Sequence, residues 1–539
     1  MQKFIVLLGA AIAALQPSYA LSQGSPLIID RGRPDRAAVT AQKPHPPTTP
    51  RLPGPHVSKI KPFVLRHVRI EGSSLTPPWI NAALKPYIGT TVDEHALARI
   101  SNSLARLYAE RGDIALYTVT VPTQAFKNGV LHLVATEGYI EYVDIKGLPA
   151  HKLGLVAQYS RRLMKDRPLK RSTLQRTLSL LRDIPGLTVD VRLLHGNTPG
   201  AVRMVLTLTQ KPWHLTLSAN DAGSNPLGRF QFQAKASRYG LLTPGEETSL
   251  IVLVPAAVRR FQYVALTEAV PLNDNGLMLQ AALGYLRTRP KAPYPEGNAS
   301  NAQVLLAYPL LRNFEESLTV SGGIDGIDSS NATLGEIIAN ERIRALRLSG
   351  AYAVQAATSA FAVNVSLSNG LNIFGAHTNS AWGETDFKKA TLQASYTRLF
   401  GRAFVGRLRA TGQWAFDRLP VSELYGLGGD IGRAFPAAAA MGDSGLGGAA
   451  EIGYLPPHLP KMLQGAELFG FADGGTVHTR NRLGFGGRDD HLASAGIGIR
   501  LPLRQRTKLE LAAANGLYSN APGIAPGHWR ITFSVSTAS

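Results

Sequence analysis

Few residues of this chain are spaced for catalysis or metal binding. Gly442-Asp443-Ser444-Gly445 has the form of a serine-nucleophile loop, but that chemistry needs a histidine base and an orienting carboxylate, and no histidine stands in a matching context. The 13 histidines are never closer than eleven positions apart, and cysteine is absent. Histidine-pair and cysteine-type metal sites and thiolate nucleophiles are therefore excluded. We expect no catalytic site, no metal and no cofactor.

One long connection offers a different chemistry, an ion pair in a confined site. Residues 417–445 interrupt strand-like sequence, and loops of this length are usually functional. Small residues surround one cation in Gly432-Arg433-Ala434-Phe435, and an acid follows in Phe471-Ala472-Asp473-Gly474-Gly475. Because an unpaired charge in a confined site is costly, we predict that the loop folds into a barrel lumen, where Arg433 meets Asp473. The alternative is an exposed loop whose ion pair contributes about 0–1 kcal/mol.

The elements that must position this pair are predicted to be strands of a barrel. From Trp213 onward, segments alternate between two kinds of side chain with a period of two residues, as strands do. The 327 residues from Trp213 to Ser539 permit about sixteen strands in a transmembrane antiparallel β-barrel. A soluble β-sandwich or propeller is the alternative. The alternating segments are 214–218, 229–236, 264–270, 277–284, 317–324, 344–351, 361–368, 391–396, 404–411, 466–472, 497–503, 508–513 and 529–535.

Two small α+β modules are predicted before the barrel. In residues 63–147, the patterns predict a strand over 63–72, helices over 77–87 and 93–111, and strands over 116–121, 130–135 and 140–145. Asp93 is a plausible N-cap for the second helix. Residues 148–212 show a similar order, with helices over 153–164 and 172–181 and strands over 189–194 and 202–209.

The N-terminal sequence and the composition indicate export from the cytoplasm. Residues 1–20, MQKFIVLLGAAIAALQPSYA, have the charged start, apolar run and small-x-small end of a signal peptide. Residues 21–62 become proline-rich, which predicts an extended linker. The net charge is +20, but the basic residues are spread along the chain rather than clustered in runs, so we expect no nucleic-acid partner. Charged residues make up only 17%, which suits a surface that faces something other than water.

The chain resembles the two-partner secretion transporters of the Omp85 superfamily, the haemolysin secretion/activation group. That family's sixth extracellular loop carries the motif VRGY, whose arginine meets the aspartate of an F-x-D-x-G motif on a wall strand. Gly432-Arg433-Ala434-Phe435 matches the first motif at the arginine and by an aromatic residue; Phe471, Asp473 and Gly475 match the second. Residues that resemble the first periplasmic POTRA domain are Gly72, Tyr108, Gly112, Pro122, Gln124, Gly129, Glu137 and Gly138, and Pro185 and Gly186 resemble the second.

The resemblance implies an outer-membrane transporter rather than an enzyme. Its two POTRA domains would bind an unfolded exoprotein of haemolysin or adhesin type in the periplasm and pass it through the barrel. Outer-membrane lipid and the barrel assembly machinery are the other implied partners. Residues 28–39 lie where the family carries a helix that plugs the barrel, and the family's usual C-terminal aromatic is replaced by Ala538-Ser539. An Omp85-class assembly factor and a porin-like solute channel stay open as alternatives.

Overall fold

The computed structural model describes residues 61–539, apart from 125, 150–152, 222, 225, 292–295, 331–339, 379–382, 461–462, 483–485 and 504–505. The predicted signal peptide, plug helix and nearly all of the predicted linker lie outside the described residues. The chain divides into two compact units: one extends to Lys211 and also includes Arg312–Phe314, and the other contains the remaining residues from Pro212 onward. Among the described residues, no helix is long and apolar enough to cross a membrane.

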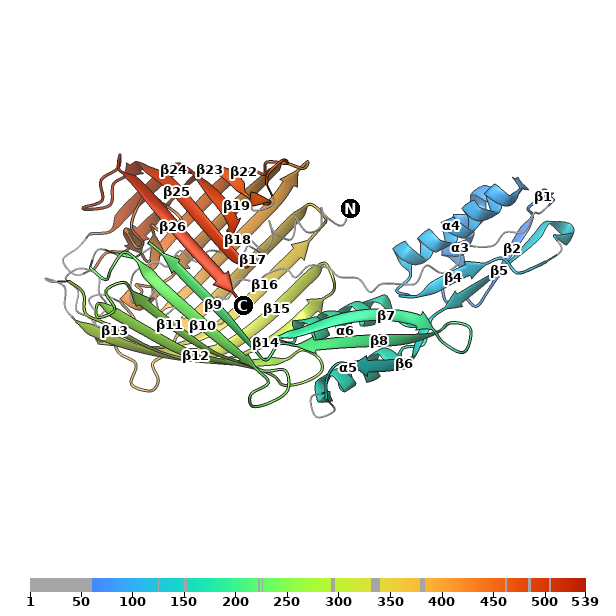
Figure 1. The fold of residues 1–539 in the computed structure, drawn as a ribbon, viewed down its shortest axis with the longest axis horizontal. Coiled ribbons are helices and arrows are strands. Elements are labelled where there is room, and N and C mark those ends of the chain that lie inside the picture. Colours follow the sequence, from blue (N-terminus) through green and yellow to red (C-terminus); the bar gives the residue numbers. More distant parts are fainter. Residues whose placement is uncertain are drawn as a thin grey trace. The chain divides into compact units, whose positions relative to one another are not determined.

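The first module is a three-stranded sheet with helices on one face (Figure 1). Its sheet order is β2-β5-β4, with β2 parallel and β4 antiparallel to β5. Leu97, Ile100 and Leu104, spaced along one side of the long helix, are buried with Leu131 and Leu133 of β5, as the helical period predicted. The elements are β1 (Phe63–Val64), β2 (His67–Glu71), α3 (Pro77–Leu84), η3 (Lys85–Tyr87), β3 (Thr91–Val92), α4 (Glu94–Arg111), β4 (Tyr117–Thr120), η4 (Lys127–Gly129) and β5 (Val130–Glu137).

Asp93 caps α4 as predicted. Its carboxylate accepts a hydrogen bond from the backbone N–H of Ala96 at 2.7 Å, which satisfies a donor that the first turn of a helix leaves unpaired. The same hydrogen bond lowers the pKa of Asp93 below its ordinary value. The cap therefore stays charged at neutral pH.

The second module repeats the topology of the first. Its elements are β6 (Tyr139–Lys146), α5 (Gly154–Lys165), α6 (Arg171–Asp183), β7 (Leu187–His195) and β8 (Ala201–Gln210). The sheet order is β6-β8-β7, with β6 parallel and β7 antiparallel to β8. We expected residues 140–145 to complete the first module, so the predicted boundary after 147 lies one strand too late. A parallel pair needs a long crossover, and α5 and α6 supply it between β6 and β8.

The two modules are joined through one residue, Gly138, which lies between β5 and β6. Its N–H donates to the carbonyl of Leu116 at 2.7 Å, and its carbonyl accepts from the N–H of Leu169 at 2.8 Å. A Cβ at this position would lie 2.8 Å from the side chain of Leu116. Across the same joint, Asp113 accepts hydrogen bonds from the N–H and hydroxyl of Ser172 at 2.9 and 2.6 Å. The joint is therefore closely fitted.

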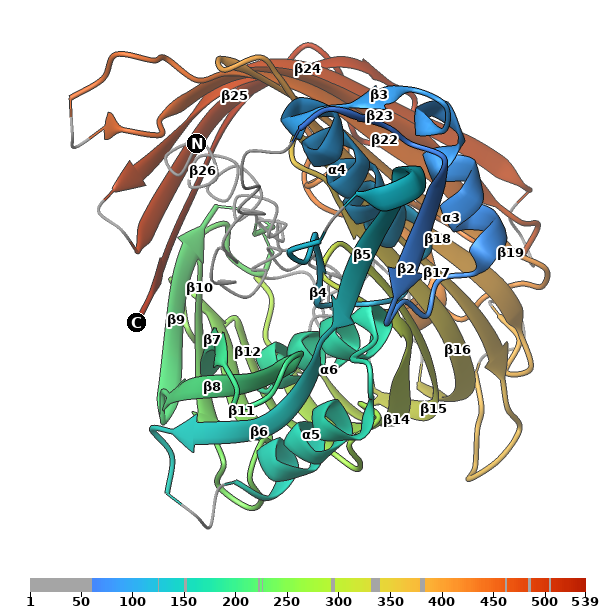
Figure 2. The ribbon, with the colours of Figure 1, turned by 90° about the vertical axis from the view of Figure 1, so that its right-hand side faces the viewer.

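Sixteen antiparallel strands close into a barrel (Figure 2). This confirms the predicted fold class and strand number. The strands are β9 (Trp213–Asn220), β10 (Gln231–Tyr239), β11 (Glu247–Pro255), β12 (Phe261–Pro271), β13 (Met278–Thr288), β14 (Gly297–Arg312), β15 (Glu316–Ser329), β16 (Glu341–Gln355), β17 (Ser359–Gly370), β18 (Lys388–Phe400), β19 (Phe404–Ala415), β22 (Ser444–Tyr454), β23 (Glu467–Thr479), β24 (Arg488–Leu503), β25 (Thr507–Ser519) and β26 (Trp529–Ala538).

The barrel wall has a buried inner face and an apolar outer face. In β16, Ala345, Arg347 and Ala353 are buried while Leu346 and Leu348 are exposed, because successive side chains of a strand point to opposite faces. Large exposed aromatic residues lie at both strand ends. Trp213, Phe400, Phe404 and Tyr454 lie toward one edge, and Tyr285, Trp414, Tyr518 and Trp529 toward the other. An apolar band between two aromatic girdles is typical of a barrel that spans a membrane.

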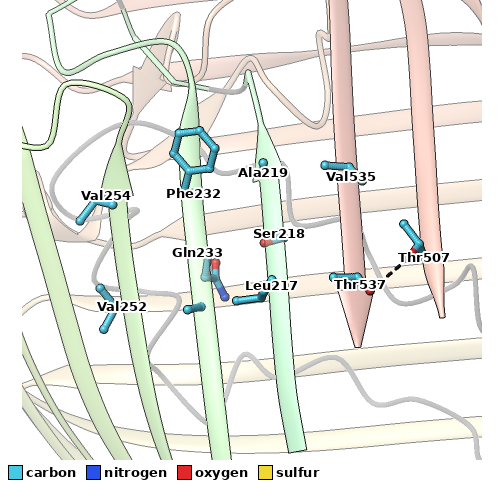
Figure 3. Close-up of a pocket in the computed structure, with 11 residues that line it drawn as sticks. Leu217, Ser218, Ala219, Phe232, Gln233, Val252, Val254, Thr507, Val535 and Thr537 are labelled. Atoms are coloured by element: carbon cyan, nitrogen blue, oxygen red, sulfur yellow. Dashed lines mark hydrogen bonds between the residues drawn. The ribbon is translucent and has the colours of Figure 1, made fainter. Parts of the chain in front are cut away.

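The ladder of backbone hydrogen bonds at the seam of the barrel, between the last strand, β26, and the first, β9, is short. β26 and β9 share five paired positions, whereas β12 and β13 share eleven. On the outer side, Leu217, Phe232, Val535 and Thr537 help to line an apolar groove of about 380 Å³ (Figure 3). Phe533, the last aromatic residue of the chain, packs against Phe230 with ring centroids 5.8 Å apart.

The motif residues of the modules support turns and a hydrogen-bond network. The Tyr108 hydroxyl contacts Ser73 Oγ at 2.6 Å and Glu137 Oε1 at 2.8 Å, and Ser74 donates to the same carboxylate oxygen. Burial raises the pKa of Tyr108 above its ordinary value, so its hydroxyl keeps its proton. Gly72 has φ of 76°, and a Cβ there would lie 2.3 Å from the carbonyl oxygen of Ala135.

The other motif residues also lie at turns and strand ends. The side-chain amide of Gln124 pairs with the backbone N–H and carbonyl of His132, at 2.7 Å each, and also donates to the Pro122 carbonyl at 3.3 Å. Gly112 donates its N–H to the carbonyl of Tyr108 at the end of α4. Backbone conformations with positive φ are found at Gly129 and at Gly186, which follows Pro185.

We predict that Tyr108→Phe destabilises the first module by about 1.5–3 kcal/mol, because a hydrogen bond to the charged Glu137 carboxylate is lost. Pulse proteolysis of the full chain in urea would measure the shift in the unfolding midpoint. Tyr142→Phe is the control, since the Tyr142 side chain is exposed. Equal midpoints for both variants would contradict a stabilising role for the network.

Candidate functional site

The connection between β19 and β22, residues 416–443, has its own local structure. It contains a 3-10 turn, η6 (Val421–Glu423), and a short antiparallel pair, β20 (Tyr425–Leu427) with β21 (Ala440–Gly442). Leu427, Ile431 and Phe435 are buried in one apolar cluster with Val477 and Leu492 of the wall strands β23 and β24. The loop therefore packs against the inner face of the barrel, where the prediction placed it, rather than being exposed.

Glycines of the wall make room for the loop. A Cβ at Gly447 would lie 2.9 Å from the Tyr425 hydroxyl, and one at Gly475 would lie 3.0 Å from Leu427. At Gly516, a Cβ would lie 2.8 Å from the ring of Phe435. Contacts this close would force the Tyr425, Leu427 and Phe435 side chains to shift. Gly475, a predicted motif residue, thus permits the loop to approach β23.

The structure brings the predicted pair Arg433 and Asp473 together. Arg433 Nε lies 3.1 Å from Asp473 Oδ2, with side-chain exposures of 10% and 0%. The guanidinium also lies 3.9 Å from the centroid of the Phe471 ring, an arrangement that favours a cation over an aromatic face. Arg433 is therefore held by charge and by stacking, and both partners were among the predicted residues.

The backbone of the loop tip completes this contact. Gly432 and Arg433 donate their N–H groups to Asp473 Oδ1 at 2.9 and 3.2 Å, and the Ser494 hydroxyl bonds to the same oxygen. Gly432 has φ of 88°, a conformation that glycine adopts without a steric cost. Ala434, which replaces the motif glycine, is outside this left-handed region. The alanine is therefore compatible with the turn.

A second carboxylate, Glu451 of β22, lies beside the pair. Arg407 Nη1 is 2.8 Å from Glu451 Oε1, Arg500 Nη2 is 2.9 Å from Oε2, and Arg433 Nη2 is 3.4 Å from Oε2. Arg407 and Arg500 also contact Glu467. This cluster of three arginines and their acids is only slightly exposed, and each of these charges has a partner, which a buried charge requires.

The two ends of the loop are fixed by separate ion clusters. At the first end, Glu423 lies 2.7 Å from both Arg347 and Lys389, and these three side chains are almost fully buried. At the second end, Asp443 lies 2.7 Å from Arg482 and accepts the N–H of Leu419 at 2.7 Å. Asp443 of the sequence Gly-Asp-Ser-Gly therefore holds the base of the loop.

Arg530 links the loop tip to the barrel seam. Its Nη1 donates to the Phe435 carbonyl at 2.7 Å, and its Nη2 donates to the Asp221 carbonyl at 3.2 Å. Asp221, which follows β9, accepts the N–H of Phe533 in β26 through its carboxylate at 2.9 Å. One arginine thus contacts the loop and a residue that helps to join the first and last strands.

Sequence reasoning missed Glu451 and Arg500, which lie beside the predicted pair, and Glu423, which lies at the first end of the loop. A signal was present in β22, where Glu451 is the only charged residue of Ser-Gly-Leu-Gly-Gly-Ala-Ala-Glu-Ile-Gly-Tyr. It occupies the same strand face as Ala449, which pairs with Asp473. A lone acid on the inner face of a glycine-rich strand indicates a buried partner.

Two family models match parts of the chain. Residues 270–501 match the model of the family described as haemolysin secretion/activation protein ShlB/FhaC/HecB, and residues 63–138 match the POTRA domain of ShlB type. None of the curated proteins compared matches the chain.

Solved structures similar to this chain include two CdiB proteins and a BamA. CdiB from Escherichia coli is 18% identical with a TM-score of 0.69, covering 91% of this chain and 93% of its own. CdiB from Acinetobacter baumannii is 16% identical with a TM-score of 0.60, covering 99% and 98%. BamA from Haemophilus ducreyi lacking POTRA domains 1–3 is 15% identical with a TM-score of 0.53, covering 89% and 100%. At these identities the likeness shows a shared fold.

We predict that Asp473→Ala releases the loop tip, because removing one partner of a buried pair costs about 3–5 kcal/mol. The chain has no cysteine, so Ala434→Cys can report the accessibility of the tip to a maleimide. We expect faster labelling in the Asp473→Ala background, by about tenfold or more. Labelling of Ala257→Cys, at an exposed bend between β11 and β12, should stay constant. Equal labelling of Ala434→Cys in both backgrounds would show that Asp473 does not hold the tip.

Proposed function

Because the chain belongs to the ShlB/FhaC/HecB family of haemolysin secretion/activation proteins, we propose that it exports one large, unfolded exoprotein to the cell surface. The chain is an Omp85-type protein transporter of the outer membrane, with its POTRA region in the periplasm. The proposal adds that the client is a haemolysin or adhesin, and that the protein transports rather than catalyses. The barrel assembly machinery would insert it into the outer membrane.

The observation that carries the proposal is the loop held inside the barrel by Arg433. A client polypeptide can pass through the barrel lumen only if the loop is held against the wall or moves out of its path. Because Arg433 contacts Asp473, Glu451 and the Phe471 ring, its side chain makes the ion pairs of the tip with the barrel wall. We infer that export depends on this side chain, whereas the hydrogen-bonded wall forms without it.

Capture of the client is proposed to use sheet edges of the POTRA region. In the sheet β6-β8-β7, β7 is an edge strand of nine residues, and the edge of a sheet can accept a further strand. An extended client can add a strand there, and backbone hydrogen bonds would give binding that tolerates many sequences. Such binding suits a partner that arrives unfolded.

We predict that Arg433→Ala reduces export of the exoprotein by at least about tenfold, because Asp473 and Glu451 would lose a buried counter-charge. Arg433→Lys should also be impaired, since an ammonium cannot reproduce the planar contacts of a guanidinium. Secretion of the client into the medium would be measured beside barrel assembly, read as the difference in gel migration between boiled and unboiled protein. Arg259→Ala, at an exposed turn, is the matched control. Normal export by an assembled Arg433→Ala barrel would contradict the proposal.

We further predict that a photo-reactive residue at Arg192, an exposed position of β7, crosslinks to the unfolded client. The same residue at Arg161, on an exposed position of α5, is the control and should give little product. Crosslinking is read as a band of higher mass that contains both proteins. Product at Arg161 but not at Arg192 would place the client on another surface.

A further inference from the structure

A groove on the outer wall of the barrel lies between β13 and the segment that follows β17. Its volume is about 490 Å³. Ser300 and Ala302, with small side chains, and Gly326, with none, line the groove, while Leu283 and Ile324 are larger outward-facing neighbours. In the strand register, Leu283 pairs with Ala302 and Gly326 pairs with Arg344. A row of small residues between large ones forms a channel in an otherwise apolar wall.

One side of the groove is formed by Ile373 and Phe374. Phe374 is 77% exposed and has φ of 51°, a conformation that a bulky residue rarely adopts. Phe374 therefore gains little burial from the protein itself. Burial of a phenylalanine side chain is worth about 1.5–3 kcal/mol. An apolar ligand in the groove would supply that burial.

Asp328 and Arg344 line one end of the groove, and Arg342 lies beside that end through its contact with Asp328. Arg344 Nη1 lies 2.6 Å from Asp328 and Arg342 Nε lies 3.4 Å from the same carboxylate. Two guanidinium groups share one acid, so one positive charge is in excess. Arg342 keeps 45% of its side chain exposed. The seam groove has no basic residue in its lining and therefore offers the apolar surface without this charge.

The strand directions show at which edge of the barrel the groove lies, and therefore which leaflet of the outer membrane it faces. Trp213, which begins β9, directly follows the last residues of the periplasmic region. Because the strands are antiparallel, the start of β14, the end of β15 and the start of β16 lie at the opposite edge. Ser300, Asp328 and Arg342 belong to those strand ends. They therefore lie at the cell-surface edge, where the outer leaflet places its phosphorylated heads.

We propose that this groove binds a phosphorylated, multiply acylated glycolipid of the outer leaflet. One acyl chain lies along Ser300, Ala302 and Gly326 against Phe374, and a phosphate of the head binds Arg342. Guanidinium and phosphate form charge-assisted, often bidentate hydrogen bonds. A charged lipid-facing side chain near the interface, which is otherwise mildly unfavourable, thereby obtains a partner.

The test is native mass spectrometry of the full-length protein in detergent, titrated with diphosphorylated lipid A. We expect Arg342→Gln to weaken binding by about tenfold, since a hydrogen bond to a charged group is lost. Ala302→Phe, which fills the groove without changing its charge, should weaken binding to a similar degree. Dephosphorylated lipid A should bind the unaltered protein as weakly as the diphosphorylated form binds Arg342→Gln.

Two matched variants serve as controls. Arg259→Gln removes an exposed cation elsewhere, and Ala472→Phe enlarges an exposed alanine of β23; both should bind lipid A normally. Assembly of every variant is checked by the gel migration of unboiled protein. If only one of the two groove variants, Arg342→Gln or Ala302→Phe, assembles, that variant is sufficient for the test. Equal binding by all assembled variants would overturn the proposal. Equal or tighter binding of phosphatidylglycerol, which shares the phosphate and acyl chains but not the sugar head, would overturn the assignment to the glycolipid.

Discussion

The closed ladder of backbone hydrogen bonds is the constraint on which the structure depends. No water is available inside a bilayer to satisfy N–H and C=O groups, so a sheet can span it only as a ring. Closure divides every strand into an inner and an outer face and thereby creates a confined interior. The alternation along β16, the apolar belt and the interior in which Arg433 lies all follow from that one requirement. The short ladder between β9 and β26 is where the ring is completed.

The buried charges inside the barrel form three clusters, spaced along the loop between β19 and β22. Separate acid–base clusters hold the first end at Glu423, the tip at Arg433 and the second end at Asp443. Each cluster is almost enclosed, so breaking any one would leave a charge without water or a counter-ion. The glycines beneath the loop allow these contacts by removing the side chains that would keep it away. The ion pairs that hold the loop therefore depend on the wall glycines that let it come close.

Most of the architecture could be predicted from local patterns, whereas the partners of each charge could not. Period-two alternation indicated most wall strands, including a strand that begins after residue 445, where β22 lies, but missed β11 and β14. Leu250-Ile251-Val252-Leu253-Val254 in β11 is apolar on both faces, so it does not alternate clearly. Arg433 and Asp473 were found because each is a charge in a stretch of small or apolar residues. Glu451, Arg407 and Arg500 were missed because their proximity arises from strand register, which depends on pairing across the sheet. For the same reason, β6 was assigned to the wrong module.

The single-glycine connection at Gly138 has a mechanical consequence. With one residue between two sheets and hydrogen bonds on both sides of it, a rotation of one module against the other would have to break the contacts at Gly138 and Asp113. The orientation of each module is thereby coupled to that of its neighbour.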